Sequence, residues 1–357
     1  MLRFSDLKIG IDKAADAETE RQALRKLILS QLKISDKELI DYKIFKKSID
    51  ARKKDKILFV YTVDVEIHNE AQILGKYSSK GITPTPDLSY KGVPLGTENM
   101  AERPVVIGMG PAGLFAGLLL ARNGYNPIIL EREEDVETRT QKVNKFWHRG
   151  QLDTESNVQF GEGGAGTFSD GKLTTLINDR RCRNVLEEFI KAGAPPEILY
   201  KSKPHVGTDI LKTVVKNIRQ EIMAYGGEVR FKAKVTDFII QDGNIHGVII
   251  NDNEEVCCQV ILLAIGHSAR DTYEVLLHRG ITMSQKPFSI GVRMEHPQEF
   301  IDKAQYGDVA GHPGLGAADY KLVYHSPNGR SAYTFCMCPG GYVVAAASEE
   351  QGVVTNG

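Results

Sequence analysis

"VVIGMGPAGLFAGLLLARNGYNPIILERE", residues 105–133, is the stretch that decides the fold class of this chain. "PVVIG" has the composition of a buried parallel strand, residues 112–123 have that of a helix, and "NPIIL" supplies a second strand. Gly108, Gly110 and Gly113 lie between the first strand and the helix with G-x-G-x-x-G spacing. This order of elements predicts the βαβ unit of a Rossmann-type α/β fold.

The glycine turn has the residues that a phosphate cradle needs. Gly108 permits a tight turn, Gly110 lets the backbone approach a pyrophosphate, and Gly113 lets the helix pack close to the strand. Pro111 and Ala112 open the helix, whose N-terminal N–H groups would face the phosphates. The alternative is a glycine-rich corner that binds nothing, and the complete strand and helix context argues against it.

An acidic residue ends the second strand. Glu131, with Arg132 beside it, is placed to accept hydrogen bonds from both hydroxyls of a ribose. A carboxylate there disfavours a 2′-phosphate, so the adenosine of FAD or NAD fits better than NADPH. Gly117, one helical turn after Gly113, would bring the helix still closer to the sheet.

A second glycine cluster, "QFGEGGAGTFSDGKL", covers residues 159–173. Its exposed N–H groups could hold another phosphate or a ribityl chain, with Gly163, Gly164 and Thr167 as candidates. The alternative is a flexible surface loop. A dehydrogenase that uses only nicotinamide does not need such an element, so the cluster favours a flavin.

The chain beyond this cluster has the elements of a flavoprotein. A helix is expected over 208–225, followed by two strands hinged at residues 242–243, with Val235 beside an adenine. "QVILLAIGHSARDT" predicts a buried strand that returns to the cofactor, with Ala264 and Gly266 at its end.

Several long stretches carry a resemblance to a known family. They are "RPVVIGMGPAGLFAG", "FGEGGAGTFSDGKL", "LLAIGHSARDTYE", "PFSIGVRMEHPQEFID", "LGAADYKLVYH" and "CPGGYVVAAASEEQGVVTNG". From Arg103 onward the chain resembles bacterial FAD-dependent dehydrogenases described as NAD(FAD)-utilising, within the glutathione-reductase-type superfamily. The resemblance implies FAD at the Rossmann site and no defined substrate. It also implies that the chain is truncated at its C-terminus, because the family continues beyond "GVVTNG".

Composition limits the partners of this chain. The 357 residues include 45 basic and 46 acidic side chains, so no global field favours nucleic acid or an anionic membrane. Five cysteines without framework spacing indicate reduced thiols. With no apolar signal segment at the start, we expect a cytoplasmic protein with a small-molecule substrate, no membrane partner and no metal site.

Four regions are expected along the chain. Residues 1–77 should form a small α+β, ferredoxin-like domain, and residues 78–103 a linker rich in Pro, Gly and Ser. Residues 104–274 should form the FAD-binding domain, and residues 275–357 a substrate or cap segment that is incomplete at its C-terminus. The lysine cluster within 43–56 is best explained as a solvated hairpin edge. The alternative is an RNA-associated flavoprotein module that binds nucleic acid through this hairpin.

Candidate catalytic residues are few. A cation near the flavin would stabilise its reduced form, and Lys172, Arg270 and Arg293 are the candidates, with Arg293 preferred. His267 follows the last sheet strand and suits proton transfer. For each of these residues, an ordinary surface or structural role is the favoured alternative. We therefore predict an FAD-dependent oxidoreductase of unknown substrate, with NADH or NADPH as a transient electron donor.

Overall fold

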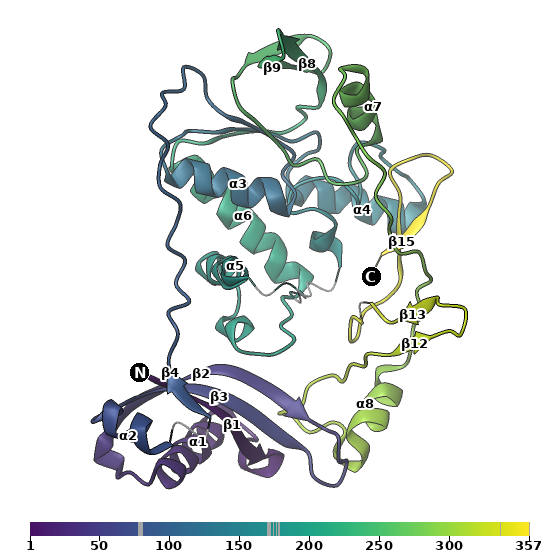
Figure 1. Ribbon diagram of the computed structural model, residues 1–357. Helices are drawn as coiled ribbons and strands as arrows, with labels where there is room; N and C mark the ends of the chain where they lie inside the picture. The colour runs from purple at the N-terminus through teal and green to yellow at the C-terminus, as the bar shows by residue number, and fades with distance from the viewer. Residues whose placement is uncertain are drawn as a thin grey trace.

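The computed structural model describes residues 1–77, 81–169, 173, 175, 177, 179–335 and 337–356. Two folded units can be distinguished in Figure 1; extended chain joins them on two sides, and backbone hydrogen bonds of Lys47 with Tyr200 and Ser202 connect them directly. The N-terminal unit lies at one end, the unit with the predicted βαβ element lies at the other, and the C-terminal part of the chain runs between them.

The N-terminal unit is a four-stranded antiparallel sheet with helices. Its strands have the order β2-β3-β1-β4, and the elements follow one another as β-α-β-β-α-β. They are β1 (Leu2–Gly10), α1 (Ala17–Leu32), β2 (Leu39–Asp50), β3 (Leu58–Ile67), α2 (Glu70–Tyr77) and β4 (Ile82–Pro84). The edge strand β4 falls inside the stretch 78–103 that the sequence assigns to a linker, because apolar Ile82 is buried in this core.

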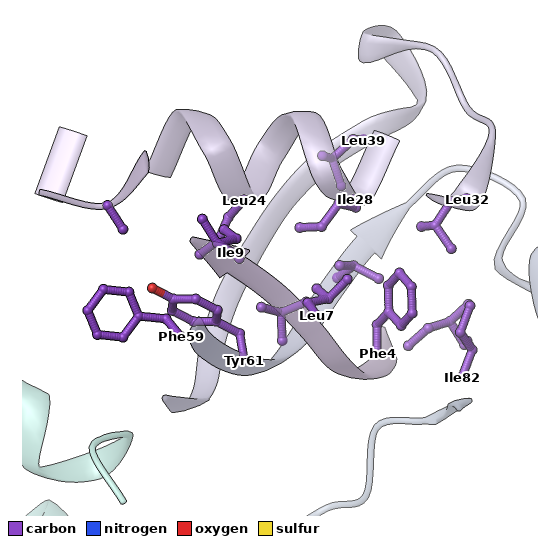
Figure 2. Packing of buried hydrophobic residues seen from close by; sticks show 14 of the residues in the cluster. Phe4, Leu7, Ile9, Leu24, Ile28, Leu32, Leu39, Phe59, Tyr61 and Ile82 are labelled. Carbon is purple, nitrogen blue, oxygen red and sulfur yellow. The ribbon is translucent and has the colours of Figure 1, made fainter. Parts of the chain in front are cut away.

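Helix α1 covers one face of this sheet. Leu24, Ile28 and Leu32 repeat at helical spacing, are at most 1% exposed, and point to the sheet (Figure 2). Phe59 and Tyr61 alternate along β3 toward the same core and are fully buried. The helix begins at a capping box formed by Asp16 and Thr19.

The C-terminal part of the chain contributes to the same N-terminal core. Ile301 and Tyr306 of α8 (Gln298–Tyr306), with Leu315 and Ala318 after it, belong to the hydrophobic cluster beneath the sheet of the N-terminal unit. Part of the segment 275–357, which we expect to be a substrate or cap segment, thus packs on the N-terminal core; its role stays a prediction. The physical reason is that α8 is amphipathic and buries its apolar face on this core.

The second unit is built on a parallel sheet in the order β11-β5-β6-β7. These strands are β5 (Val105–Ile107), β6 (Ile128–Leu130), β7 (Glu228–Arg230) and β11 (Ile261–Leu263). Three further strands, β8 (Val235–Gln241), β9 (Asn244–Ile250) and β10 (Glu254–Cys257), form a separate antiparallel sheet. The strand expected before Gly266 occurs as β11 and pairs in parallel with β5, but it is not buried as expected, since Leu263 is exposed. The mixed α/β class with a parallel sheet is confirmed.

Both faces of the parallel sheet are covered. Val106 and Ile129 point to the helices α3 (Pro111–Arg122), α5 (Arg180–Lys191) and α6 (Thr208–Ala224). Val105 and Ile128 point to the antiparallel sheet and to α7 (Arg270–His278) on the opposite face. Burial on two sides explains the unbroken apolar runs of β5 and β6.

The remaining elements complete the chain. They are α4 (Val136–Arg149) beside the second glycine cluster and two small hairpins, formed by β12 (Val323–His325) with β13 (Ser331–Tyr333) and by β14 (Val344–Ala346) with β15 (Val354–Asn356). Among the described residues, no helix is long and apolar enough to cross a membrane.

Candidate cofactor site

A cavity of about 500 Å³ opens at the carboxyl ends of the parallel strands β5, β6 and β11. This edge of a parallel sheet is where α/β folds generally bind ligands. Both glycine clusters reach it. Its wall consists of Ile107, Gly108, Gly110, Pro111, Ala112, Leu130, Glu131, Arg132, Gln159, Phe160, Gly161, Gly164, Ala165, Ala233, Lys234, Val235, Leu263, Ala264, Ile265, Gly266, His267, Ala269, Thr272 and Tyr273.

The glycines of the first turn have three different environments. Gly108 has φ +93°, and a Cβ there would lie 2.7 Å from the carbonyl oxygen of Ala264. A Cβ on Gly113 would lie 1.8 Å from the carbonyl oxygen of Gly108, so helix and turn are in direct contact. A Cβ on Gly110 would meet nothing within 4 Å. Gly110 therefore leaves open space at the N-terminus of α3, where the cavity lies.

The second glycine cluster packs directly on the first. The N–H of Gly163 donates to the carbonyl oxygen of Met109 at 2.9 Å. Gly164 has φ +70°, and a Cβ there would lie 2.8 Å from Cδ of Pro111. The two motifs are therefore parts of one cavity wall, although about 50 residues separate them in sequence.

Glu131 lies beneath the first glycine turn. It is 3% exposed, and its Oε2 accepts a hydrogen bond from the N–H of Met109 at 2.7 Å. Its Oε1 accepts from the N–H of Glu133 at 3.1 Å. A carboxylate oxygen can accept more than one hydrogen bond, so the side chain can bind hydroxyls in the cavity while it holds the turn.

Charged side chains form the rim of the cavity beside Glu131. Arg132 contacts Asp271 at 2.5 Å and Glu155 at 3.2 Å, and Lys234 contacts the same two carboxylates at 2.9 and 3.0 Å. Burial alone would raise the pKa of Asp271, but hydrogen bonds from Arg132 and Lys234 outweigh it and lower that pKa. The guanidinium of Arg132 also lies 4.7 Å from the ring of Phe160. The four charged side chains of the rim are thus held in place by their mutual ion pairs.

The opposite wall comes from β8, β11 and α7. Val235, Ala264, Gly266 and His267, all singled out from the sequence, line the cavity. The hydroxyl of Tyr273 donates to the carbonyl oxygen of Gly266 at 2.6 Å, which ties α7 to the end of β11. His267 is exposed at the mouth.

Among the described residues, five candidates from the sequence do not line the cavity: Gly113, Gly163, Thr167, Arg270 and Arg293. Arg293 is exposed and donates to the carbonyl oxygen of Thr355 at 3.1 Å, because the chain after α7 runs away from the sheet. Thr167 is fully buried beneath the second glycine cluster, with its hydroxyl 3.3 Å from the carbonyl oxygen of Glu162. Lys172 lies outside the described residues. Within the described ranges, the wall includes no residue after Tyr273.

Sequence reasoning missed several wall residues. Gln159 and Phe160 are the first two residues of the second glycine cluster, and Lys234 comes immediately before Val235. Their position next to candidates was the available signal. Tyr273 had no such signal, since its role depends on how α7 packs. No group of three or more potential metal ligands occurs in the part of the chain that the structure describes.

Comparisons with known proteins bear on both ends of the chain. Residues 287–357 match a family described as "FAD-dependent protein, C-terminal domain-like". This part of the chain is thus similar to the C-terminal domain of FAD-dependent proteins. Residues 1–66 match a family described as a domain of unknown function, DUF8436.

Two relatives and one solved structure are similar to this chain. An uncharacterized protein of Clostridium beijerinckii is 50% identical over 357 residues, which are 100% of this chain and 66% of that protein. The digeranylgeranylglycerophospholipid reductase of Haloferax volcanii is 30% identical over 206 residues, 57% of this chain and 44% of that protein. The crystal structure of Thermovibrio ammonificans THI4 superposes with a TM-score of 0.35 and 18% identity, over 51% of this chain and 64% of that chain. The chain thus spans just under two thirds of the first relative and under half of the second.

Proposed function

We propose that this protein binds FAD in the cavity at the end of the parallel sheet and uses it as an oxidoreductase. The observation that carries the proposal is the direct packing of the two glycine clusters, with Gly110 open toward the cavity. The match of residues 287–357 to an FAD-dependent family supports the identity of the cofactor. The reductase among the relatives supports the class of reaction.

The residues of the cavity fit the parts of a dinucleotide. The first turn of α3, after Gly110, has N–H groups without helical partners that suit a pyrophosphate. Glu131 suits the ribose hydroxyls, and the start of β8 at Val235 suits an adenine. Gly164, from the second cluster, lies against Pro111 and would extend the phosphate cradle. We also infer a ferredoxin-like N-terminal domain from its β-α-β-β-α-β order.

FAD would supply the electron transfer, and the protein would supply binding and orientation. His267 at the cavity mouth is the proposed proton donor or acceptor, since an imidazole titrates near neutral pH. We propose a small-molecule substrate, with NADH or NADPH as a transient reductant. The RNA-associated alternative gains nothing from the relatives. The exposed lysines of the β2-β3 hairpin fit an ordinary solvated edge, whereas Lys47 is partly buried and paired with Glu20.

A flavin titration tests this proposal. The purified protein is denatured, any released flavin is identified by chromatography, and the cofactor-free protein is titrated with FAD, FMN and ADP. We expect FAD and ADP to bind and FMN to bind far more weakly, since the proposed contacts are to the adenosine and pyrophosphate. Absence of FAD binding to well-folded protein would contradict the proposal.

Two glycine substitutions provide the matched pair for this titration. Gly110→Val would fill the open space beside the cavity, whereas Gly75→Val would add the same atoms to α2 in the other unit. A Cβ meets nothing within 4 Å at either position, so neither substitution should clash within the protein. We expect only Gly110→Val to abolish binding of FAD.

A further inference from the structure

An arginine from α4 is buried behind the second glycine cluster. Arg139 has no exposed surface, and its guanidinium donates to four backbone carbonyls at 2.9–3.1 Å. Two of these carbonyls belong to Asn157 and Val158, which precede the glycines, and two belong to Glu162 and Gly164 within the cluster. One side chain thus holds both ends of the loop formed by residues 157–164.

A buried carboxylate accompanies this arginine. Glu133 is 1% exposed, and its Oε2 lies 3.1 Å from Nε of Arg139. Its Oε1 accepts a hydrogen bond from the N–H of Asn157 at 2.7 Å. A Cβ on Gly161, a wall residue of the cavity, would lie 2.2 Å from Oε2 of Glu133. The ion pair therefore lies directly behind the cavity wall.

Stability alone does not explain a pair of this kind. Removing two charges from water is costly, and well-packed apolar side chains often stabilise a core as much or more. Burial raises the pKa of Glu133, and the attraction of Arg139 opposes that effect only in part. The donors of Arg139 are directed at backbone oxygens of the loop, and among the described residues only the oxygen of Gly164 also accepts a backbone N–H, that of Thr167. The pair of Arg139 and Glu133 therefore serves to fix the conformation of the loop.

We propose that Arg139 and Glu133 form a buried clamp that positions the loop of residues 157–164 as a wall of the cofactor cavity. Both are positioning residues, since neither lines the cavity itself. Through the N–H of Gly163, which donates to the carbonyl oxygen of Met109, the clamp also aligns the two glycine clusters. The role in cofactor binding rests on the proposed function, whereas the ordering of the loop does not.

Three variants separate positioning from charge balance. Arg139→Met removes the donors and leaves Glu133 unpaired, so it should destabilise the protein. The double variant Glu133→Gln with Arg139→Met removes both buried charges and should recover much of that stability. Arg122→Met is the matched control, because Arg122 makes ion pairs with Glu188 and Glu221 on the α5 and α6 side of the unit.

Hydrogen exchange of the cofactor-free proteins gives the first readout. We expect the amides of residues 157–164 to exchange faster in Arg139→Met and in the double variant, and to stay as protected as wild type in Arg122→Met. FAD titration gives the second readout. The dissociation constant should rise about tenfold or more in both clamp variants, given what a charge-assisted hydrogen bond contributes.

The double variant decides the outcome. If its stability recovers while the loop still exchanges quickly and FAD still binds weakly, the clamp acts by positioning. If loop protection and FAD affinity recover together with stability, the pair only balances charge and the proposal is overturned. If wild type binds no FAD but the exchange pattern is as expected, the cofactor assignment fails and the ordering of the loop stands. Should Arg139→Met fail to fold, the double variant alone supplies the comparison.

Discussion

Replacing Gly113 by alanine tests the close contact between helix α3 and the first glycine turn. The added Cβ would lie 1.8 Å from the carbonyl oxygen of Gly108 and 2.9 Å from its carbon, so backbone atoms would have to move. Overpacking of a rigid site costs about 1–3 kcal/mol, and alanine regains about 1 kcal/mol of helix propensity over glycine. Because a backbone oxygen cannot rotate away, we expect the high end of this range, a net loss of about 2 kcal/mol.

Gly117→Ala is the matched control in the same helix. Its Cβ would lie 2.3 Å from Cδ1 of Ile129, the far end of a side chain that can adopt another rotamer. The gain in helix propensity should offset most of that cost, so the expected change in unfolding free energy is within about 1 kcal/mol. Urea unfolding followed by the fluorescence of Trp147, the one tryptophan of the chain, measures both variants. Equal stability of the two would refute the argument from backbone contact.

Three further predictions concern other parts of the molecule. Ile301→Ala should destabilise the N-terminal unit by about 2–4 kcal/mol in urea unfolding, since Ile301 is buried in its core, while Phe300→Ala, at an exposed neighbour, should not. Burial raises the pKa of Glu162 to about 7, so the folded state keeps a proton that the unfolded state releases above about pH 4.5. Stability should therefore fall as the pH rises from 5 to 7, and Glu162→Gln should flatten this pH dependence of the urea midpoint. Glu137→Gln is the control, because Glu137 also pairs with Arg219, and this substitution should leave the pH dependence unchanged. Lys47→Ala should lower the thermal midpoint, because it removes the ion-pair partner of Glu20, a half-buried residue of α1. An unchanged midpoint would contradict this expectation.

The elements that the sequence predicts well are those with a strong local pattern. The helices expected at 112–123 and 208–225 occur at Pro111–Arg122 and Thr208–Ala224. The hinge at residues 242–243 occurs as expected, with Asp242 at φ +49° and Gly243 at φ +76°. Local propensity and burial agree at these positions, so their pattern is readable without tertiary information.

What depends on long-range packing was not predictable. Arg293 was chosen as a cation because of its neighbours in sequence, but its distance from the cavity follows from the path of the chain after α7. The buried Arg139 had no local signal either, since an arginine within "VETRTQKV" has the pattern of a surface helix.

The path of the chain also joins its two ends. Residues that match one family at 1–66 and another at 287–357 contribute to the same hydrophobic cluster, with Ile301 and Leu315 packed beneath the N-terminal sheet. The second unit, which contains the parallel sheet, is therefore inserted in the sequence between two segments that share one hydrophobic core. Lys47 of β2 exchanges backbone hydrogen bonds with Tyr200 and Ser202 of the cofactor unit, at 2.7 and 3.0 Å. The N-terminal unit is therefore connected to the second unit by the chain on two sides and by this backbone contact. For this reason, the N-terminal unit helps to set where the C-terminal segment lies relative to the cavity.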